Sequence, residues 1–337
     1  MSDKSKIEWT EATWNPIRGC SRISEGCRNC YAETIANRFK GEGLPYQGLI
    51  ASSGTWNNNV IWVEDLITQP LRWKKPRRIF VNSMSDLFHQ SIPMYILDKI
   101  FAVMLLAQQH TFQVLTKRAD EMQHYLTAPY REQSIKAAAR EILGYFPKQS
   151  SAGMAASWPL KNIWLGVSVE DQKTAEQRIP PLLKSPATLR WISAEPILDA
   201  INLNSSVGGT LWIGGQRGCK GTHRGIGTEE CPKHPRHHHD DRCGPGLDWV
   251  VAGGESGKNA RPMQPEWIRS LRDQCVAAQV PFFFKQWGEH GLNWYNDNNG
   301  RKIPGSEWVY RAGKNNAGRE LDGRTWDEYP YKAASCK

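Results

Sequence analysis

Residues 78–86 read Arg-Ile-Phe-Val-Asn-Ser-Met-Ser-Asp, an apolar run that ends abruptly in small polar residues. Such a run is typical of a strand that is buried on both faces. Further along, apolar side chains follow the i, i+3, i+4 spacing of an amphipathic helix, at Leu97, Ile100, Phe101, Met104 and Leu105. The segment therefore predicts one strand–helix unit of an α/β fold.

The same pattern recurs along the chain. Further buried strands are predicted at 112–115, 163–167, 189–192, 249–252 and 282–284. Helices are predicted at 32–39, after Arg118 to about residue 145, at 173–184 and after Pro265. With the segment before Cys20 as a first strand, the alternation predicts an α/β, TIM-barrel-like parallel barrel, partial or full. The strands end in polar or glycine residues, as barrel strands do at the edge that carries active sites. A doubly wound open sheet is the alternative.

Two regions stand outside the repeat. Residues 201–247 form a Cys/His-rich insertion within a barrel-like catalytic domain that spans residues 1–287. Residues 288–337 are aromatic and turn-rich, and we expect a C-terminal packing appendage there. Asp322-Gly323 predicts a hairpin within that appendage.

Composition limits the class of protein. The 337 residues are 39% hydrophobic, which describes a soluble globular chain and not a disordered one. Lys and Arg number 43 against 34 Asp and Glu, a net charge of +9 that favours an anionic partner such as nucleic acid or a nucleotide. A solvated basic surface is the alternative.

The longest apolar run, 100–107, is too short to cross a membrane, and no signal peptide is apparent, so we expect a cytoplasmic protein.

Three cysteines gather in the polar stretch 15–31, with the spacing C-x6-C-x2-C at Cys20, Cys27 and Cys30. Glycines precede Cys20 and Cys27 and allow sharp turns there. In a reducing cytoplasm, clustered thiols favour a metal over disulfides. Zinc usually takes four protein ligands, and no fourth is near. Three thiolates on a 4Fe–4S cluster leave one iron open, which is the site that S-adenosylmethionine needs in order to chelate the cluster.

The stretch also resembles a known family. Trp14-Asn15-Pro16, Gly19-Cys20 and Gly26-Cys27 through Ala32 are similar to the signature of the phage-type three-Cys-motif family. Later runs that fit it are 115–118, 166–168, 194–196, 253–257 and 283–288. The resemblance covers most of the chain and extends to the radical S-adenosylmethionine (radical SAM) enzymes, whose usual motif is C-x3-C-x2-C. It implies an iron–sulfur enzyme that cleaves S-adenosylmethionine with an electron from a donor protein.

Several strand-end residues are candidates for cofactor or substrate binding. Gly253, Gly254, Glu255 and Ser256 follow a strand, where tandem glycines expose backbone N–H groups and Glu255 can hold an amine or a ribose hydroxyl. The alternative is a tight turn with a capping Ser256. Glu195 is a similar candidate, against the alternative of a salt bridge at the sheet edge.

Other strand ends carry hydroxyl or basic groups. Ser83 follows the strand at 78–82 and is a further cofactor-binding candidate. Lys117, Arg118 and Lys285 are suited to bind a carboxylate or a phosphate. The alternative for each is an ordinary charged edge.

The insertion supplies a second metal candidate. Cys219, Cys231, Cys243 and one histidine, taken as His234, are suited to bind a structural Zn2+. The alternative is an exposed loop with incidental histidines.

Two functions follow from these features. The leading one is a radical SAM-like enzyme that acts on an unknown substrate, nucleic acid or a nucleotide, with an electron donor and a partner protein and without a membrane. The alternative is a zinc-stabilised nucleic-acid-binding protein that performs no radical chemistry.

Overall fold

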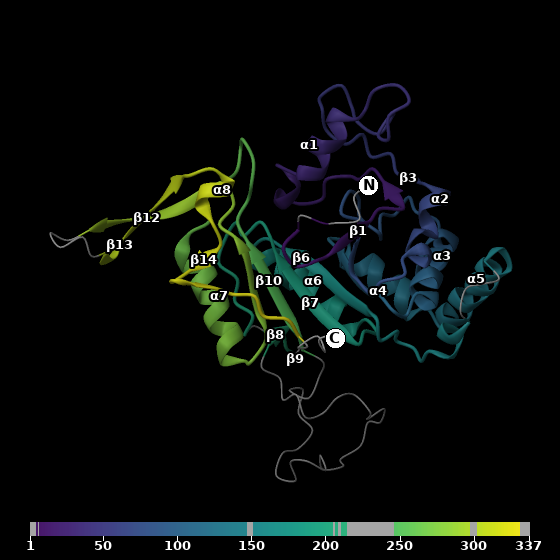
Figure 1. Ribbon diagram of the computed structural model, residues 1–337. Coiled ribbons are helices and arrows are strands. Elements are labelled where there is room, and N and C mark those ends of the chain that lie inside the picture. The colour runs from purple at the N-terminus through teal and green to yellow at the C-terminus, as the bar shows by residue number, and fades with distance from the viewer. Residues whose placement is uncertain are drawn as a thin grey trace, which may run out of the picture. The chain divides into compact units, whose positions relative to one another are not determined.

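Seven strands of the computed structural model form one sheet (Figure 1). The structure describes residues 5, 7–146, 151–204, 206–207, 210–213, 246–296 and 302–330. The strands of the sheet are β1 (Ala12–Trp14), β4 (Arg78–Val81), β5 (Thr111–Thr116), β6 (Ile163–Val169), β7 (Leu189–Ala194), β10 (Trp249–Gly253) and β11 (Phe282–Gln286).

The strands lie in the sheet in the order in which they occur in the chain, β1-β4-β5-β6-β7-β10-β11. Neighbouring strands pair in parallel, with Ala12 opposite Ile79, Phe112 opposite Ile163 and Trp249 opposite Trp191. A doubly wound sheet reverses its order at a switch point, whereas a barrel adds each strand beside the last. The order therefore rules out the doubly wound alternative and is that of a partial TIM-barrel-like sheet.

The helices connect the strands. They are α1 (Tyr31–Arg38), α2 (Glu64–Ile67), α3 (Met94–Leu106), α4 (Ala119–Thr127), α5 (Arg131–Tyr145), α6 (Gln172–Lys184), α7 (Pro265–Ala277) and α8 (Lys314–Ala317). Short 3-10 helices are η1 (Glu25–Cys27), η2 (Gln69–Arg72) and η3 (Ala152–Ala155).

The predicted strands are confirmed. β4 ends at Val81, one residue before the predicted end, and the strands predicted from 112 onward each extend by one or a few residues beyond the apolar run. The single helical stretch predicted up to residue 145 is wrong, because α4 ends at Thr127 and α5 begins at Arg131. Pro129 lies between them, and a proline disfavours helical backbone in the residue that precedes it. Nine of the thirteen residues of α3 are buried, since α5 and η3 pack against it.

The chain divides into two compact units. The first comprises Met1–Ser168 with Lys184–Leu189, and the second comprises Val169–Leu183 with Arg190–Lys337. In the first unit, β2 (Ile17–Arg18) and β3 (Ile61–Trp62) form a separate antiparallel pair. This pair holds the beginning of the three-cysteine loop.

The second unit carries the C-terminal segment. β12 (His290–Asn296) and β13 (Lys302–Arg311) form an antiparallel hairpin, drawn in yellow in Figure 1. β14 (Glu320–Leu321) and β15 (Arg324–Thr325) form a second hairpin, with Asp322 and Gly323 at φ 53° and 79°. The predicted Asp322-Gly323 hairpin is confirmed, because both central residues adopt the positive φ of a two-residue turn. The peptide N–H of Phe284 binds the carbonyl of Trp326, so this segment packs on β11.

Part of the insertion lies outside the described residues, including Cys219, Cys231, His234 and Cys243. Its described part contains the short pair β8 (Ser206–Val207) and β9 (Thr210–Leu211). Of the helices within the described ranges, none has both the length and the apolar character that a bilayer span requires.

Candidate metal centre in the three-cysteine loop

Backbone geometry fixes the entry to the three-cysteine loop, residues 19–31. Gly19 adopts φ 90° and forms a parallel bridge with Ser85, just after β4. A Cβ atom at Gly19 would lie 2.2 Å from the carbonyl oxygen of Asn59, so only glycine fits. The sharp turn predicted before Cys20 is confirmed. Gly26 instead lies within η1, whose 3-10 turn brings the chain round to Cys27.

The three cysteines are free and half-buried. Burial and the nearby Asp86 carboxylate raise the pKa of the Cys20 thiol to about 12, and the Arg118 guanidinium offsets part of this rise. Burial also raises the pKa of Cys30, and the negative charge of Cys27 adds to the rise at both other thiols. Ionisation of one thiol therefore disfavours ionisation of the others. Cys20 and Cys30 pack on a small apolar cluster, Ala32, Ala36, Tyr46, Leu49, Trp56 and Met84.

The donor chemistry of this loop fits a soft metal or an iron–sulfur cluster. Three thiols converge in one loop, and a bound cation would favour the thiolates that burial now disfavours. Within the described ranges, however, no three Cys, His, Asp or Glu side chains are close enough to hold a metal ion as a group. In the described conformation the three thiols are therefore not grouped as a metal site.

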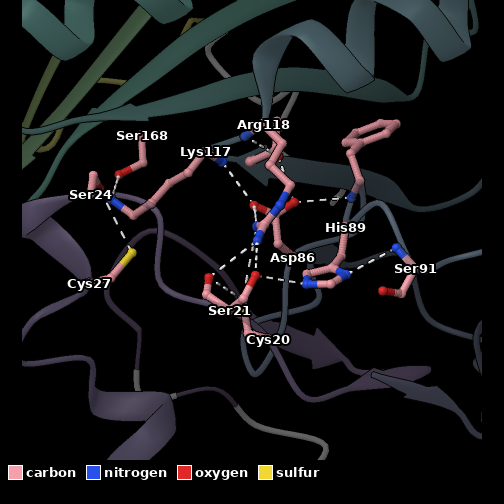
Figure 2. A network of polar contacts seen from close by, with 12 residues as sticks. Cys20, Ser21, Ser24, Cys27, Asp86, His89, Ser91, Lys117, Arg118 and Ser168 are labelled. Atoms are coloured by element: carbon pink, nitrogen blue, oxygen red, sulfur yellow. Dashed lines mark hydrogen bonds and ion pairs between the residues drawn. The ribbon is translucent and has the colours of Figure 1, made fainter. Parts of the chain in front are cut away.

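An arginine joins the loop to the ends of β4 and β5 (Figure 2). The Arg118 guanidinium donates to the Asp86 carboxylate at 3.0 Å, to the Ser21 hydroxyl at 2.7 Å and to the Ser21 carbonyl at 3.2 Å. Its Nη1 atom lies 4.0 Å from the Cys20 sulfur. We call Asp86, Arg118, Ser21 and His89 the Arg118 network.

Asp86 is fully occupied within this network. One carboxylate oxygen accepts from the Phe88 N–H at 3.0 Å and the Thr116 hydroxyl at 2.6 Å. The other accepts from the Lys117 N–H and from Arg118, both at 3.0 Å. The carboxylate therefore orients Arg118 and has little capacity left to bind a metal.

His89 has a defined tautomer. The Ser91 N–H donates to Nδ1 at 3.2 Å, so the proton of the neutral ring is on Nε2, which lies 2.9 Å from the Ser21 hydroxyl. Burial and the Arg118 charge lower the pKa of His89, which keeps the ring neutral. His89 thus donates to Ser21 and cannot accept its proton, which excludes a Ser–His nucleophile here.

The six residues between Cys20 and Cys27 have a structural role, because two of them contact other parts of the chain. Ser21 is bound by Arg118 and His89, and the next residue, Arg22, forms an ion pair with the buried Glu33 of α1. Glu33 also accepts from the Trp56 N–H at 2.7 Å. The extra residues therefore anchor the loop at two points.

Other candidates in the first unit make contacts within the chain. The Lys117 ammonium group donates to the Ser168 hydroxyl at 2.9 Å, and Ser24 lies 3.8 Å from the Cys27 sulfur (Figure 2). The Ser83 hydroxyl donates to the Asn15 amide oxygen at 3.1 Å, which joins the end of β4 to the residue after β1. Ser83 thus has a structural contact, and its cofactor role stays a prediction.

The second unit brings Glu195 and Lys285 together. Their side chains form an ion pair at 2.6 Å, at the carboxyl ends of β7 and β11. This is the contact that the salt-bridge alternative predicts for Glu195. Cofactor binding by either residue stays a prediction.

The glycine-rich turn after β10 is tightly packed. A Cβ atom at Gly254 would lie 2.0 Å from the Trp287 carbonyl oxygen, so the backbone after β11 occupies the space beside this glycine. Arg261 binds both carboxylate oxygens of Glu255, at 2.7 and 3.0 Å. The Ser256 hydroxyl accepts from Gln286 at 3.0 Å, and α7 begins only at Pro265, so Ser256 does not cap that helix. Gly253 lies at the end of β10, and a cofactor role for these four residues stays a prediction.

Sequence reasoning missed Asp86, His89, Ser21 and Glu33. Asp86 alone carried a signal, because an acid after one strand and Lys117-Arg118 after the next predict an ion pair at a parallel sheet edge. Nothing in the local pattern indicates that Ser21 would be the shared acceptor.

Comparisons with known proteins match the chain to a protein family. A family model described as "Protein of unknown function (DUF5131)" matches residues 4–330. No curated protein matches the chain, and no solved structure does.

Proposed function

Because this chain belongs to the DUF5131 family, whose function is unknown, we propose its function from the three-cysteine loop itself. The chain is a radical SAM-like iron–sulfur enzyme, in which Cys20, Cys27 and Cys30 hold a 4Fe–4S cluster. When bound, such a cluster supplies one electron to S-adenosylmethionine and so starts radical chemistry. The observation that carries the proposal is three free, mutually interacting thiols in one loop.

The neighbouring residues support an open coordination position on the cluster. Asp86 binds Arg118, Thr116 and two backbone N–H groups, and both ring nitrogens of His89 are engaged. Asp86 and His89, the nearby side chains that could complete a four-ligand set, are therefore committed to the Arg118 network. S-Adenosylmethionine would occupy the position that they leave open.

The substrate class in this proposal is nucleic acid or a nucleotide, supported by the net charge of +9. An electron-donor protein is required, because the chemistry consumes one electron. Ser83, Glu195, Gly253, Gly254, Glu255, Ser256 and Lys285 stay candidates for cofactor or substrate binding.

The test is anaerobic reconstitution followed by iron and sulfide analysis. We expect iron and labile sulfide in cluster proportion, a reduced-state electron paramagnetic resonance signal that changes when S-adenosylmethionine is added, and 5′-deoxyadenosine under strong reductant. Replacing Cys20, Cys27 and Cys30 together with alanine should abolish all three. Cys275→Ala, at a buried position on α7, is the matched control and should keep the cluster.

Two results would count against this proposal. Zinc without iron in anaerobically purified protein would favour the zinc-stabilised nucleic-acid-binding protein. An intact cluster that yields no 5′-deoxyadenosine would show that the protein does not cleave S-adenosylmethionine.

A further inference from the structure

Arg118 lies at the junction of three segments of the first unit. It follows β5, its ion-pair partner Asp86 follows β4, and its second partner, Ser21, lies in the three-cysteine loop. The side chains of Arg118 and Asp86 are only 9% and 8% exposed. A buried pair of this kind is costly to desolvate unless its remaining hydrogen-bonding groups are satisfied.

The hydrogen bonds of Asp86 and Arg118 connect the sheet to the three-cysteine loop. Asp86 takes four donors, which fixes the plane of its carboxylate. Arg118 then directs Nη2 at both oxygen atoms of Ser21 and places Nη1 4.0 Å from the Cys20 sulfur. An ion pair that served only to join β4 to β5 would not need the Ser21 contacts. The guanidinium therefore joins the loop to the sheet as well.

We propose that Arg118 is a positioning residue for the metal ligand Cys20. Asp86 orients the guanidinium, the guanidinium holds the backbone and hydroxyl of Ser21, and its positive charge lies beside the Cys20 sulfur. The electrostatic part of this inference rests on the proposed function, whereas the tether does not. Groups that orient metal ligands in this way are typically worth about 10- to 100-fold in metal affinity.

The tether is tested in the metal-free protein by hydrogen exchange with mass spectrometry. Arg118→Met should increase exchange of the peptide that covers residues 19–22. The matched control is Arg131→Met, which breaks a buried ion pair of the same kind, with Asp98 at 2.6 Å. The hydrogen-bond partners of Arg131 in the described part of the chain, Asp98, Tyr125 and Met94, lie outside the three-cysteine loop. Unchanged exchange at 19–22 in Arg118→Met, or an equal increase in the control, would overturn the tether.

Ser21→Ala keeps the inference testable if Arg118→Met does not fold. It removes the hydroxyl acceptor and leaves the Arg118–Asp86 ion pair intact, so we expect a smaller increase in exchange confined to the same peptide. No increase would contradict the proposal.

The electrostatic part is tested on the reconstituted protein. Arg118→Met should lower the reduction potential of the cluster, because a positive charge near the sulfur stabilises the more negative reduced state. It should also weaken iron retention about 10-fold or more against a chelator. Arg118→Lys keeps the positive charge but lacks the planar guanidinium that holds Ser21. We therefore expect a reduction potential close to that of the unmodified protein, with faster hydrogen exchange at residues 19–22. Arg131→Met should leave the potential unchanged.

The outcomes separate the two proposals. A chain that binds no iron refutes the proposed function, and the exchange result still decides the tether. An unchanged potential in Arg118→Met would show that Arg118 only supports the loop, and would overturn its electrostatic role.

Discussion

At the scale of single residues, the protonation of Cys20 depends on its neighbours. Its pKa is raised to about 12, first by burial and then by Asp86, against the opposing effect of Arg118. In metal-free protein the thiol is therefore protonated at neutral pH, and its alkylation should accelerate about tenfold per pH unit from about pH 8 to pH 10. Asp86→Asn removes the negative neighbour, which lowers the pKa and should raise the rate at pH 8. Mass spectrometry of the Cys20 peptide measures both.

Cys275 supplies the control for that experiment. It is fully buried in α7, so its alkylation reports opening of the fold and should stay slow in both proteins. A Cys20 rate that levels off below pH 9, or an Asp86→Asn rate no faster than that of the natural chain, would contradict the prediction.

The same residues show how far the sequence could predict the candidate site. Cys20, Cys27 and Cys30 are local in sequence, so their shared loop could be predicted. Arg118 contacts Ser21 across 97 positions, and only the register of the parallel strands brings the two together. The ion pair of Arg118 with Asp86 could be predicted from the two neighbouring strand ends, but the contact of Arg118 with Ser21 could not.

At the scale of elements, the ends of β10 and β11 depend on glycine. Gly254→Ala would place a Cβ atom 2.0 Å from the Trp287 carbonyl, a backbone atom that cannot yield without moving the chain. We expect a loss of about 1–3 kcal/mol in the free energy of unfolding, measured by urea denaturation. At Gly253 the nearest atom would be 3.3 Å away, so Gly253→Ala is the matched control and should cost less.

The outcome also bears on the role of this turn. If Gly254→Ala is as stable as Gly253→Ala, the close packing on Trp287 does not explain the glycine, and approach of a ligand becomes the better explanation. A clear difference between the variants supports packing.

The elements themselves differ in how well the sequence predicts them. The strands of the sheet are short apolar runs bounded by polar residues. Because strands of a parallel sheet are buried on both faces, this pattern is visible in the sequence whatever the strand order. The boundary between α4 and α5 depends on Pro129 and its neighbours. This signal is weaker than the helical spacing of apolar residues, which continues on both sides of the proline. The burial of α3 depends on α5, which no local pattern contains.

At the scale of the whole molecule, charge should govern any binding to nucleic acid. The net charge of +9 predicts that affinity for DNA or RNA falls steeply as salt rises, because basic side chains release counterions from the phosphates they contact. If about six phosphates are contacted, affinity should fall roughly 10³-fold between about 50 and 200 mM salt. Fluorescence anisotropy with labelled single- and double-stranded oligonucleotides measures the slope.

A folded protein of equal net charge without nucleic-acid function is the appropriate control, since net charge alone gives weak, salt-sensitive binding to any polyanion. Binding no tighter than that of the control at each salt concentration would mean that the basic surface is only solvated, and would leave a nucleotide or another small molecule as the substrate. Tighter binding with the same slope would point to contacts beyond the phosphates, such as stacking of bases on exposed aromatic side chains like Trp62 and Tyr95.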